Sequence, residues 1–163
     1  MKPDYIIIRG PLGIGKTTIA EKLAKKLKGE YISIDLVLEK LELDHIEGRG
    51  IPVRNFLKVN ENIMPKLKET LSSGKLVVID GNFYHKEQIE DLIKKLNFKH
   101  YVFNLKASLE TCIKRDDNRK KVYGEQAVKD VYKLVSTFDY GVSINTENKT
   151  ENEVVDEILR RIK

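Results

Sequence analysis

One short segment constrains this chain more than any other. Residues 10–17 read Gly-Pro-Leu-Gly-Ile-Gly-Lys-Thr, which fits the pattern G-x-x-x-x-G-K-[ST] at every defined position. An apolar run at 5–9 precedes the segment, and a run with the helical spacing of apolar residues follows it. The context is therefore strand, glycine-rich loop and helix, in which this pattern binds phosphate groups.

The chemistry of the loop assigns a role to each part of it. Its glycines let the backbone curl, so that successive N–H groups point at phosphate oxygens. Lys16 is the expected catalytic cation, exposed and reaching the β and γ phosphates, and the Thr17 hydroxyl is an expected ligand of Mg²⁺. The predicted cofactors are ATP and Mg²⁺. The predicted nucleotide-binding residues of the loop are Gly10, Pro11, Leu12, Gly13, Ile14, Gly15, Lys16, Thr17 and Thr18.

Strand-like and helical segments alternate along the rest of the chain. Predicted strands lie at 5–9, 31–34, 76–79, 101–105 and, more weakly, 142–145. The last helix has a capping box, formed by Thr150 and Glu153. The alternation predicts an α/β fold of three layers, with a five-stranded parallel sheet and helices on both faces. Ligands of such sheets bind at the carboxyl ends of the strands.

Composition narrows the class of protein further. The 163 residues fit a single domain spanning 1–163, and the only cysteine, Cys112, excludes an internal disulfide. No apolar run approaches the ~20 residues of a membrane span, which predicts a cytoplasmic protein without a membrane partner. A net charge of +5 would favour a polyanionic partner, but the basic residues are mostly spread through Lys-Glu helices, which is typical of a mixed, solvated surface. Composition leaves the oligomeric state open.

Two further carboxylates follow predicted strands. Asp80 ends the run 76–80 and is the expected second protein ligand of Mg²⁺, or else it caps a turn with Gly81. Asp35 follows the run 31–34 and could accept the proton of an attacking hydroxyl. The alternative for Asp35 is an N-cap for a helix beginning at Leu36.

Several patterns together resemble one family. They are the loop 10–17, Asp35, the run 80–82, and the segment 112–119 with the residues that follow it at 124–128. This set resembles the small P-loop kinases grouped around polynucleotide kinase, shikimate kinase and gluconate kinase. The resemblance implies a P-loop NTPase fold with sheet order 2-3-1-4-5, a substrate-binding region at about 36–73 and a small mobile lid at about 112–124. It also implies transfer of the ATP γ-phosphate to a hydroxyl, with Asp35 as general base.

The same resemblance makes Arg115 and Arg119 the lid arginines. Spaced four apart, they project from one face of a helix and can both meet phosphate oxygens. We expect Arg115 to act catalytically on the transferring phosphoryl group and Arg119 to bind the nucleotide. The neighbouring Asp116 and Asp117 offer the alternative of a solvated, self-paired helix face.

The acceptor side departs from the family pattern. Polynucleotide kinases usually place an arginine just after the base, whereas Leu36 follows Asp35 here. Arg49 and Arg54 are candidate replacements, with a surface loop as the alternative, and Asn82 is a candidate for the acceptor pocket. The expected partners are thus a nucleotide and a hydroxyl-bearing acceptor: an RNA or DNA end, a nucleoside or a small metabolite.

A second class of function stays open at this stage. The chain could be a module that binds or hydrolyses a nucleotide without kinase activity. A GTPase is the weaker form of this alternative, because residues 148–151 read Asn-Lys-Thr-Glu and miss the aspartate of the guanine-binding pattern N-K-x-D.

Overall fold

The computed structural model describes residues 2–162, and a parallel sheet forms its centre. The strands are β1 (Tyr5–Arg9), β2 (Glu30–Ser33), β3 (Val77–Gly81), β4 (His100–Lys106) and β5 (Val142–Asn145). All four strand pairs are parallel, and the order across the sheet is β2-β3-β1-β4-β5. The predicted α/β class and the sheet order 2-3-1-4-5 are confirmed.

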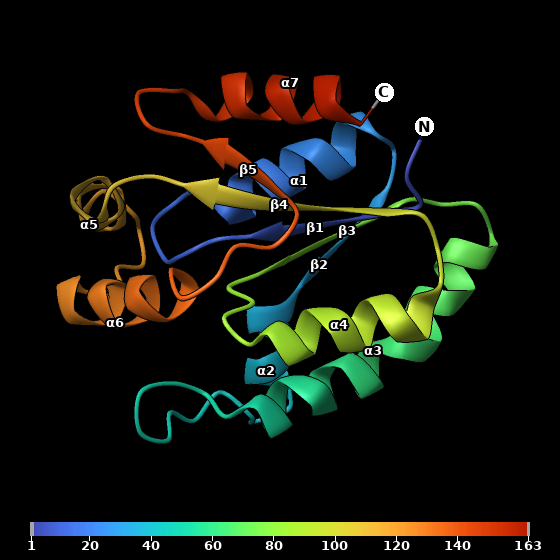
Figure 1. Cartoon of the computed structure of the whole chain (residues 1–163), viewed down its shortest axis with the longest axis horizontal. Helices are drawn as coiled ribbons and strands as arrows, with labels where there is room; N and C mark the ends of the chain where they lie inside the picture. The colour runs from blue at the N-terminus through green and yellow to red at the C-terminus, as the bar shows by residue number, and fades with distance from the viewer. Residues whose placement is uncertain (1, 163) are drawn as a thin grey trace.

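Helices cover both faces of this sheet (Figure 1). They are α1 (Lys16–Lys26), α2 (Ile34–Lys40), α3 (Val53–Ser72), α4 (Lys86–Leu96), α5 (Leu109–Asp117), α6 (Glu125–Val135) and α7 (Glu151–Arg161). In Figure 1, α1 and α7 lie above the sheet, and α2, α3 and α4 lie below it. Helices α5 and α6 lie beyond the carboxyl ends of the strands, where ligands of parallel sheets bind.

The sequence of β1 explains why helices cover both faces of the sheet. Successive side chains of a strand point to opposite faces, and all five residues of β1 are buried. Ile7 packs in the core beneath α3 and α4, while Ile6 and Ile8 pack in the core beneath α1 and α7. Each fully buried isoleucine stabilises the fold by about 2 kcal/mol, so this strand anchors both layers.

Arg9 ends β1 and is only 1% exposed. Its guanidinium donates hydrogen bonds to the Asn104 side chain at 2.9 Å and to the carbonyls of Phe83, Val135 and Phe138 at 2.9, 2.8 and 3.0 Å. Burial lowers the pKa of Arg9 to about 10, which keeps the group charged at neutral pH. This side chain therefore ties the connection between α6 and β5 to the sheet, directly before the phosphate loop.

The start of α2 differs from the prediction. The helix begins at Ile34, and its N-cap is Ser33, whose hydroxyl accepts a hydrogen bond from the Leu36 N–H at 3.2 Å. The alternative interpretation of Asp35 as the N-cap is therefore wrong. Asp35 lies in the first helical turn instead, where its charge interacts favourably with the helix dipole. Between residues 2 and 162, no helix combines the length and apolarity of a membrane span.

Candidate active site

The loop 10–17 joins β1 to α1 at the carboxyl edge of the sheet. Gly13 and Gly15 have φ angles of +80° and +95°, which residues with a Cβ rarely adopt. Gly15 occupies the N-cap position of α1 and has no side chain that could cap the helix. The N–H groups at the start of α1 and the positive end of its dipole are therefore directed to a ligand anion.

Lys16 is buried rather than exposed. The residue is 6% exposed, and its ammonium group donates a hydrogen bond to the Pro11 carbonyl at 3.3 Å. The sequence-based expectation of an exposed Lys16 is therefore wrong, because the side chain folds back over its own loop. The long contact to a neutral carbonyl is weaker than a contact between the ammonium group and an anionic phosphate oxygen.

Thr17 and Asp80 meet as predicted, and Tyr31 joins them. The carboxylate oxygen Oδ2 of Asp80 accepts hydrogen bonds from Thr17 Oγ1 at 3.1 Å and from the Tyr31 hydroxyl at 2.7 Å. Burial and the neighbouring Asp80 charge raise the pKa of Tyr31, so the phenol stays a proton donor. Tyr31 is not recognisable as a site residue from the sequence, because a tyrosine in a strand is an ordinary packing residue. The pairing of β2 with β3 could have indicated its role, because Ser33, two residues further along β2, pairs with Asp80 on β3.

Asp35 lies within electrostatic reach of the phosphate loop. Burial raises the pKa of the Asp35 carboxyl, Lys16 and Arg119 oppose that rise, and Asp80 adds to it. Four predicted site residues from separate parts of the chain thus lie close enough to interact at one edge of the sheet: Lys16, Asp35, Asp80 and Arg119. A carboxylate with a raised pKa is a stronger base than an ordinary aspartate, as a proton acceptor in catalysis requires.

A cavity of about 580 Å³ opens beside the phosphate loop. We call it the nucleotide cleft. It is lined by Gly13, Ile14, Gly15, Lys16, Thr17, Thr18, Ile19, Arg115, Asn118, Arg119, Thr146, Lys149, Thr150, Glu151 and Val154. The lining comes from the loop with α1, from the end of α5, and from the β5–α7 connection with the start of α7. Gly10, Pro11 and Leu12 are not among the lining residues, and Leu12 packs in the core.

Arg115 bridges two walls of the nucleotide cleft. Its guanidinium donates to the Ile14 carbonyl at 3.2 Å, to Thr146 Oγ1 at 2.9 Å and to the Thr146 carbonyl at 2.9 Å. These contacts join the phosphate loop to the β5–α7 connection. Thr150, in the same connection, forms the predicted capping box with Glu153.

Arg119 has looser contacts. Its guanidinium lies over the Tyr123 ring at 4.6 Å from the centroid, and 3.9 Å from the Asp116 carboxylate. Asp116 itself is fully buried, whereas Asp117 is exposed. The alternative of a solvated, self-paired helix face is therefore wrong about solvent at Asp116, although this residue does pair with Arg119.

The predicted acceptor residues do not gather in one place. Arg54, in the first turn of α3, forms an exposed ion pair with Glu47 at 2.6 Å, and Arg49 is exposed in the loop before that helix. Asn82 is 8% exposed, and its Oδ1 atom has no hydrogen-bond partner among the described residues. Tyr84 and His85, just beyond, bind the backbone N–H and carbonyl of Ile51 at 2.8 and 2.7 Å, which fixes the end of the loop that carries Arg49, directly before α3.

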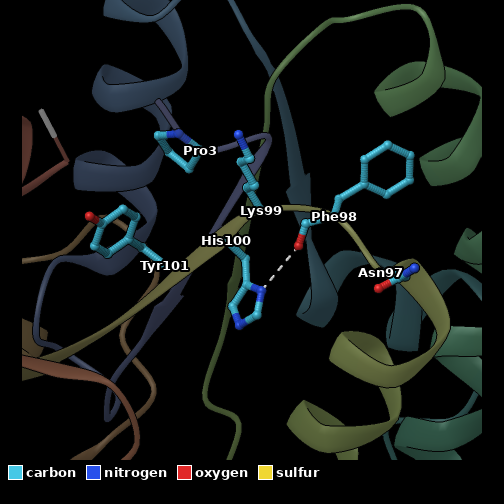
Figure 2. A pocket seen from close by; sticks show the side chains of 6 residues that line it. All are labelled: Pro3, Asn97, Phe98, Lys99, His100 and Tyr101. Atoms are coloured by element: carbon cyan, nitrogen blue, oxygen red, sulfur yellow. Dashed lines mark hydrogen bonds between the residues drawn. The ribbon is translucent and has the colours of Figure 1, made fainter. Parts of the chain in front are cut away.

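Another cavity, of about 380 Å³, lies at the opposite edge of the sheet (Figure 2). Pro3 and residues 97–101 line it, and the His100 ring contacts the Phe98 carbonyl at 3.2 Å. It opens at the amino end of β4, away from the phosphate loop. We assign it no part in the chemistry.

Comparison with known proteins agrees with this geometry. A family model described as an AAA domain matches residues 6–134, which is most of the chain. A protein of Pyrococcus furiosus described as "Putative adenylate kinase" is 30% identical over 159 residues, which cover 96% of this chain and 83% of that protein. The chain belongs to this family. It is a small P-loop kinase.

Other relatives of this kinase differ in their described acceptor. A shikimate kinase of Enterococcus faecalis is 28% identical over 176 residues, covering 98% of this chain and 99% of its own. The solved structure of a sugar kinase from Janibacter superposes with a TM-score of 0.78 at 15% identity, over 97% of this kinase and 93% of that chain. The family uses ATP, and its acceptor is either an alcohol or a phosphate group.

Proposed function

We propose that this kinase transfers the γ-phosphate of ATP to a hydroxyl group of its acceptor. The observation that carries the proposal is the position of Asp35, a carboxylate with a raised pKa beside Lys16 and Asp80. A hydroxyl must lose its proton when it attacks the phosphoryl group, and a nearby carboxylate can accept it. A phosphate acceptor needs no such base, and its own charge would be repelled by two carboxylates.

Thr17 and Asp80 fit a Mg²⁺ ion. Both offer oxygen ligands, and their hydrogen bond holds the two side chains together at the end of the phosphate loop. When bound, Mg²⁺ neutralises charge on the phosphates. Tyr31 and Thr17 hold Asp80 in place through its Oδ2 atom, and the Thr17 hydroxyl donates its proton to Asp80, which leaves its oxygen lone pairs for the ion.

The contacts of the two arginines favour an exchange of their expected roles. Arg115 has its donors engaged by Ile14 and Thr146, so we propose that it shapes the nucleotide cleft and contributes to ATP binding. Among the described residues, the Arg119 side chain makes no hydrogen bond to the phosphate loop or to Thr146, and its charge is felt by Asp35. We therefore propose Arg119 as the cation that stabilises the transferring phosphoryl group.

We propose the region 36–73 as the acceptor side of a single kinase unit, and 112–124 as its lid, in a cytoplasmic enzyme. Asn82 remains a proposed acceptor contact, because its buried Oδ1 atom is available to a donor such as a hydroxyl. Arg49 and Arg54 remain proposals, and Arg54 would have to leave Glu47 to bind an acceptor. Transfer to a nucleoside monophosphate is the second candidate, favoured by the likeness to the Pyrococcus furiosus protein.

A labelling experiment tests the proposal. The kinase is incubated with Mg²⁺, γ-labelled ATP and a panel of polyols, hydroxy acids, nucleosides, RNA and DNA with 5′-hydroxyl ends, and nucleoside monophosphates. The Lys16→Ala variant is the control for contaminating kinases. Label on a hydroxyl in the wild type alone supports the proposal. Label only on a nucleoside monophosphate selects the second candidate. Release of the label as inorganic phosphate alone would favour the alternative of a module that hydrolyses ATP without kinase activity.

A further inference from the structure

The proposed lid contains a fully buried carboxylate directly before an exposed segment of the chain. Asp116 lies near the end of α5, and none of its surface is exposed, while the residues at 117–123 are all exposed. A buried carboxylate is costly unless hydrogen bonds compensate its charge. The identity of its partners therefore indicates what the residue does.

Those partners are two backbone groups at the far end of the lid. Oδ1 of Asp116 accepts a hydrogen bond from the Tyr123 N–H at 3.1 Å, and Oδ2 accepts one from the Gly124 N–H at 3.0 Å. Gly124 is the N-cap of α6 and has a φ of +98°. One carboxylate, just before the exposed loop 117–123, thus holds the far end of that loop through two hydrogen bonds.

The same helix turn rests on the phosphate loop. A Cβ on Gly13 would lie 2.2 Å from the Cys112 carbonyl and 3.4 Å from the Cβ of Asp116. The α5 backbone is therefore packed against the loop without space between them. Any displacement of the loop at Gly13 acts directly on the turn that carries Asp116.

We propose that Asp116 is a positioning residue that couples the phosphate loop to the lid. Its carboxylate fixes Tyr123, and the Tyr123 ring lies under the guanidinium of Arg119. Arg119 is thereby kept at the cleft and does not swing freely on an exposed loop. This inference rests on the proposed role of Arg119 in phosphoryl transfer, but the anchoring itself is independent of which acceptor the kinase uses.

Trypsin tests the anchoring, because the loop offers three successive cleavage sites at Arg119, Lys120 and Lys121. Asp116→Asn keeps the size of the side chain but can accept only one of the two N–H groups. We expect cleavage at these sites to be about tenfold faster or more in Asp116→Asn, from the loss of one charge-assisted hydrogen bond. Protection by Mg²⁺ with a non-hydrolysable ATP analogue should be weaker as well. Mass spectrometry identifies the cleaved bonds.

Asp117→Asn is the matched control, since it removes the same charge from the adjacent, exposed position. Equal lid cleavage in the two variants would overturn the proposal. So would a fall in melting temperature of Asp116→Asn with faster cleavage throughout the chain, which would make the residue merely structural. A catalytic assay in which no acceptor is found leaves these readouts unaffected.

Hydrogen exchange of the wild type provides a test that needs no variant. We expect the amides of Tyr123 and Gly124 to be protected without nucleotide, and those at 120–122 to become protected only when the ATP analogue is added. Exchange at Tyr123 and Gly124 as fast as at 120–122 would contradict the anchor.

Discussion

Replacement of Gly13 by alanine should damage the protein far more than its loop position suggests. The residue has a φ of +80°, and left-handed backbone costs about 1–2 kcal/mol for a residue with a Cβ. In addition, the new Cβ would lie 2.2 Å from the Cys112 carbonyl, a backbone atom that cannot move alone. Either the phosphate loop or α5 must shift. We expect Gly13→Ala to lower the free energy of unfolding by about 3 kcal/mol or more, by analogy with overpacked cores.

Gly74→Ala separates the two contributions. Gly74 has nearly the same φ, +82°, but a Cβ there would meet nothing within 4 Å. Gly74→Ala should therefore lower the free energy of unfolding only by the cost of the left-handed backbone, about 1–2 kcal/mol. Urea unfolding followed by far-ultraviolet circular dichroism measures both variants, since the chain has no tryptophan. A Gly13→Ala variant as stable as Gly74→Ala, with unchanged ADP binding, would refute the packing of α5 on the loop.

Three further substitutions test single parts of the site. Tyr31→Phe removes the hydroxyl that holds Asp80, so activity at low Mg²⁺ should fall about tenfold and recover at high Mg²⁺. Metal-free ADP binding should be unchanged. An unaltered dependence of activity on Mg²⁺ concentration would show that Tyr31 does not position Asp80 for the metal. Asp35→Asn should raise the free energy of unfolding at neutral pH, because a raised pKa means that the folded state disfavours the charged carboxyl. This gain in stability should vanish below the ordinary pKa of 3.8, where the carboxyl is protonated in both states. Urea titrations at a series of pH values measure the gain. Arg115→Ala should raise the Michaelis constant for ATP about tenfold with a smaller effect on kcat, and Arg119→Ala should do the reverse; steady-state kinetics that give the opposite pattern would restore their original roles.

Features encoded in one stretch of sequence could be predicted well. The phosphate loop, the strand before it and the capping box at Thr150 depend on local patterns, and the structure has all three. The pairing of Thr17 with Asp80 was also predictable, because the carboxyl ends of parallel strands meet at one edge. The sheet order came from resemblance, which supplies the topology that periodicity alone leaves open.

Features that depend on how two elements pack could not be predicted. Asp116 and Asp117 look alike in sequence, and only the seating of α5 on Gly13 buries the first and exposes the second. The burial of Lys16 depends in the same way on how its loop curls, since its partner is a carbonyl of the loop itself. Arg54 was a plausible acceptor contact until Glu47, seven residues earlier, proved to be its partner.

The same limit applies to the cap of α2. Ser33 and Asp35 are both good capping residues, and the choice between them depends on where β2 ends. The strand ends at Ser33, which pairs with Asp80, so the serine caps the helix and Asp35 is left to face the phosphate loop. A shift of two residues thus separates a structural role from the proposed catalytic one.

Single-turnover phosphotransfer by Asp35→Asn tests the central claim most directly. The variant and the wild type are compared with Mg²⁺, ATP and the acceptor at saturation, and ADP affinity is measured in parallel by calorimetry. Since an amide cannot accept the hydroxyl proton near neutral pH, we expect a rate lower by about 10²- to 10⁴-fold with ADP affinity unchanged. A variant that transfers phosphate at the wild-type rate would contradict the assignment of Asp35 as the general base, and with it the argument for a hydroxyl acceptor.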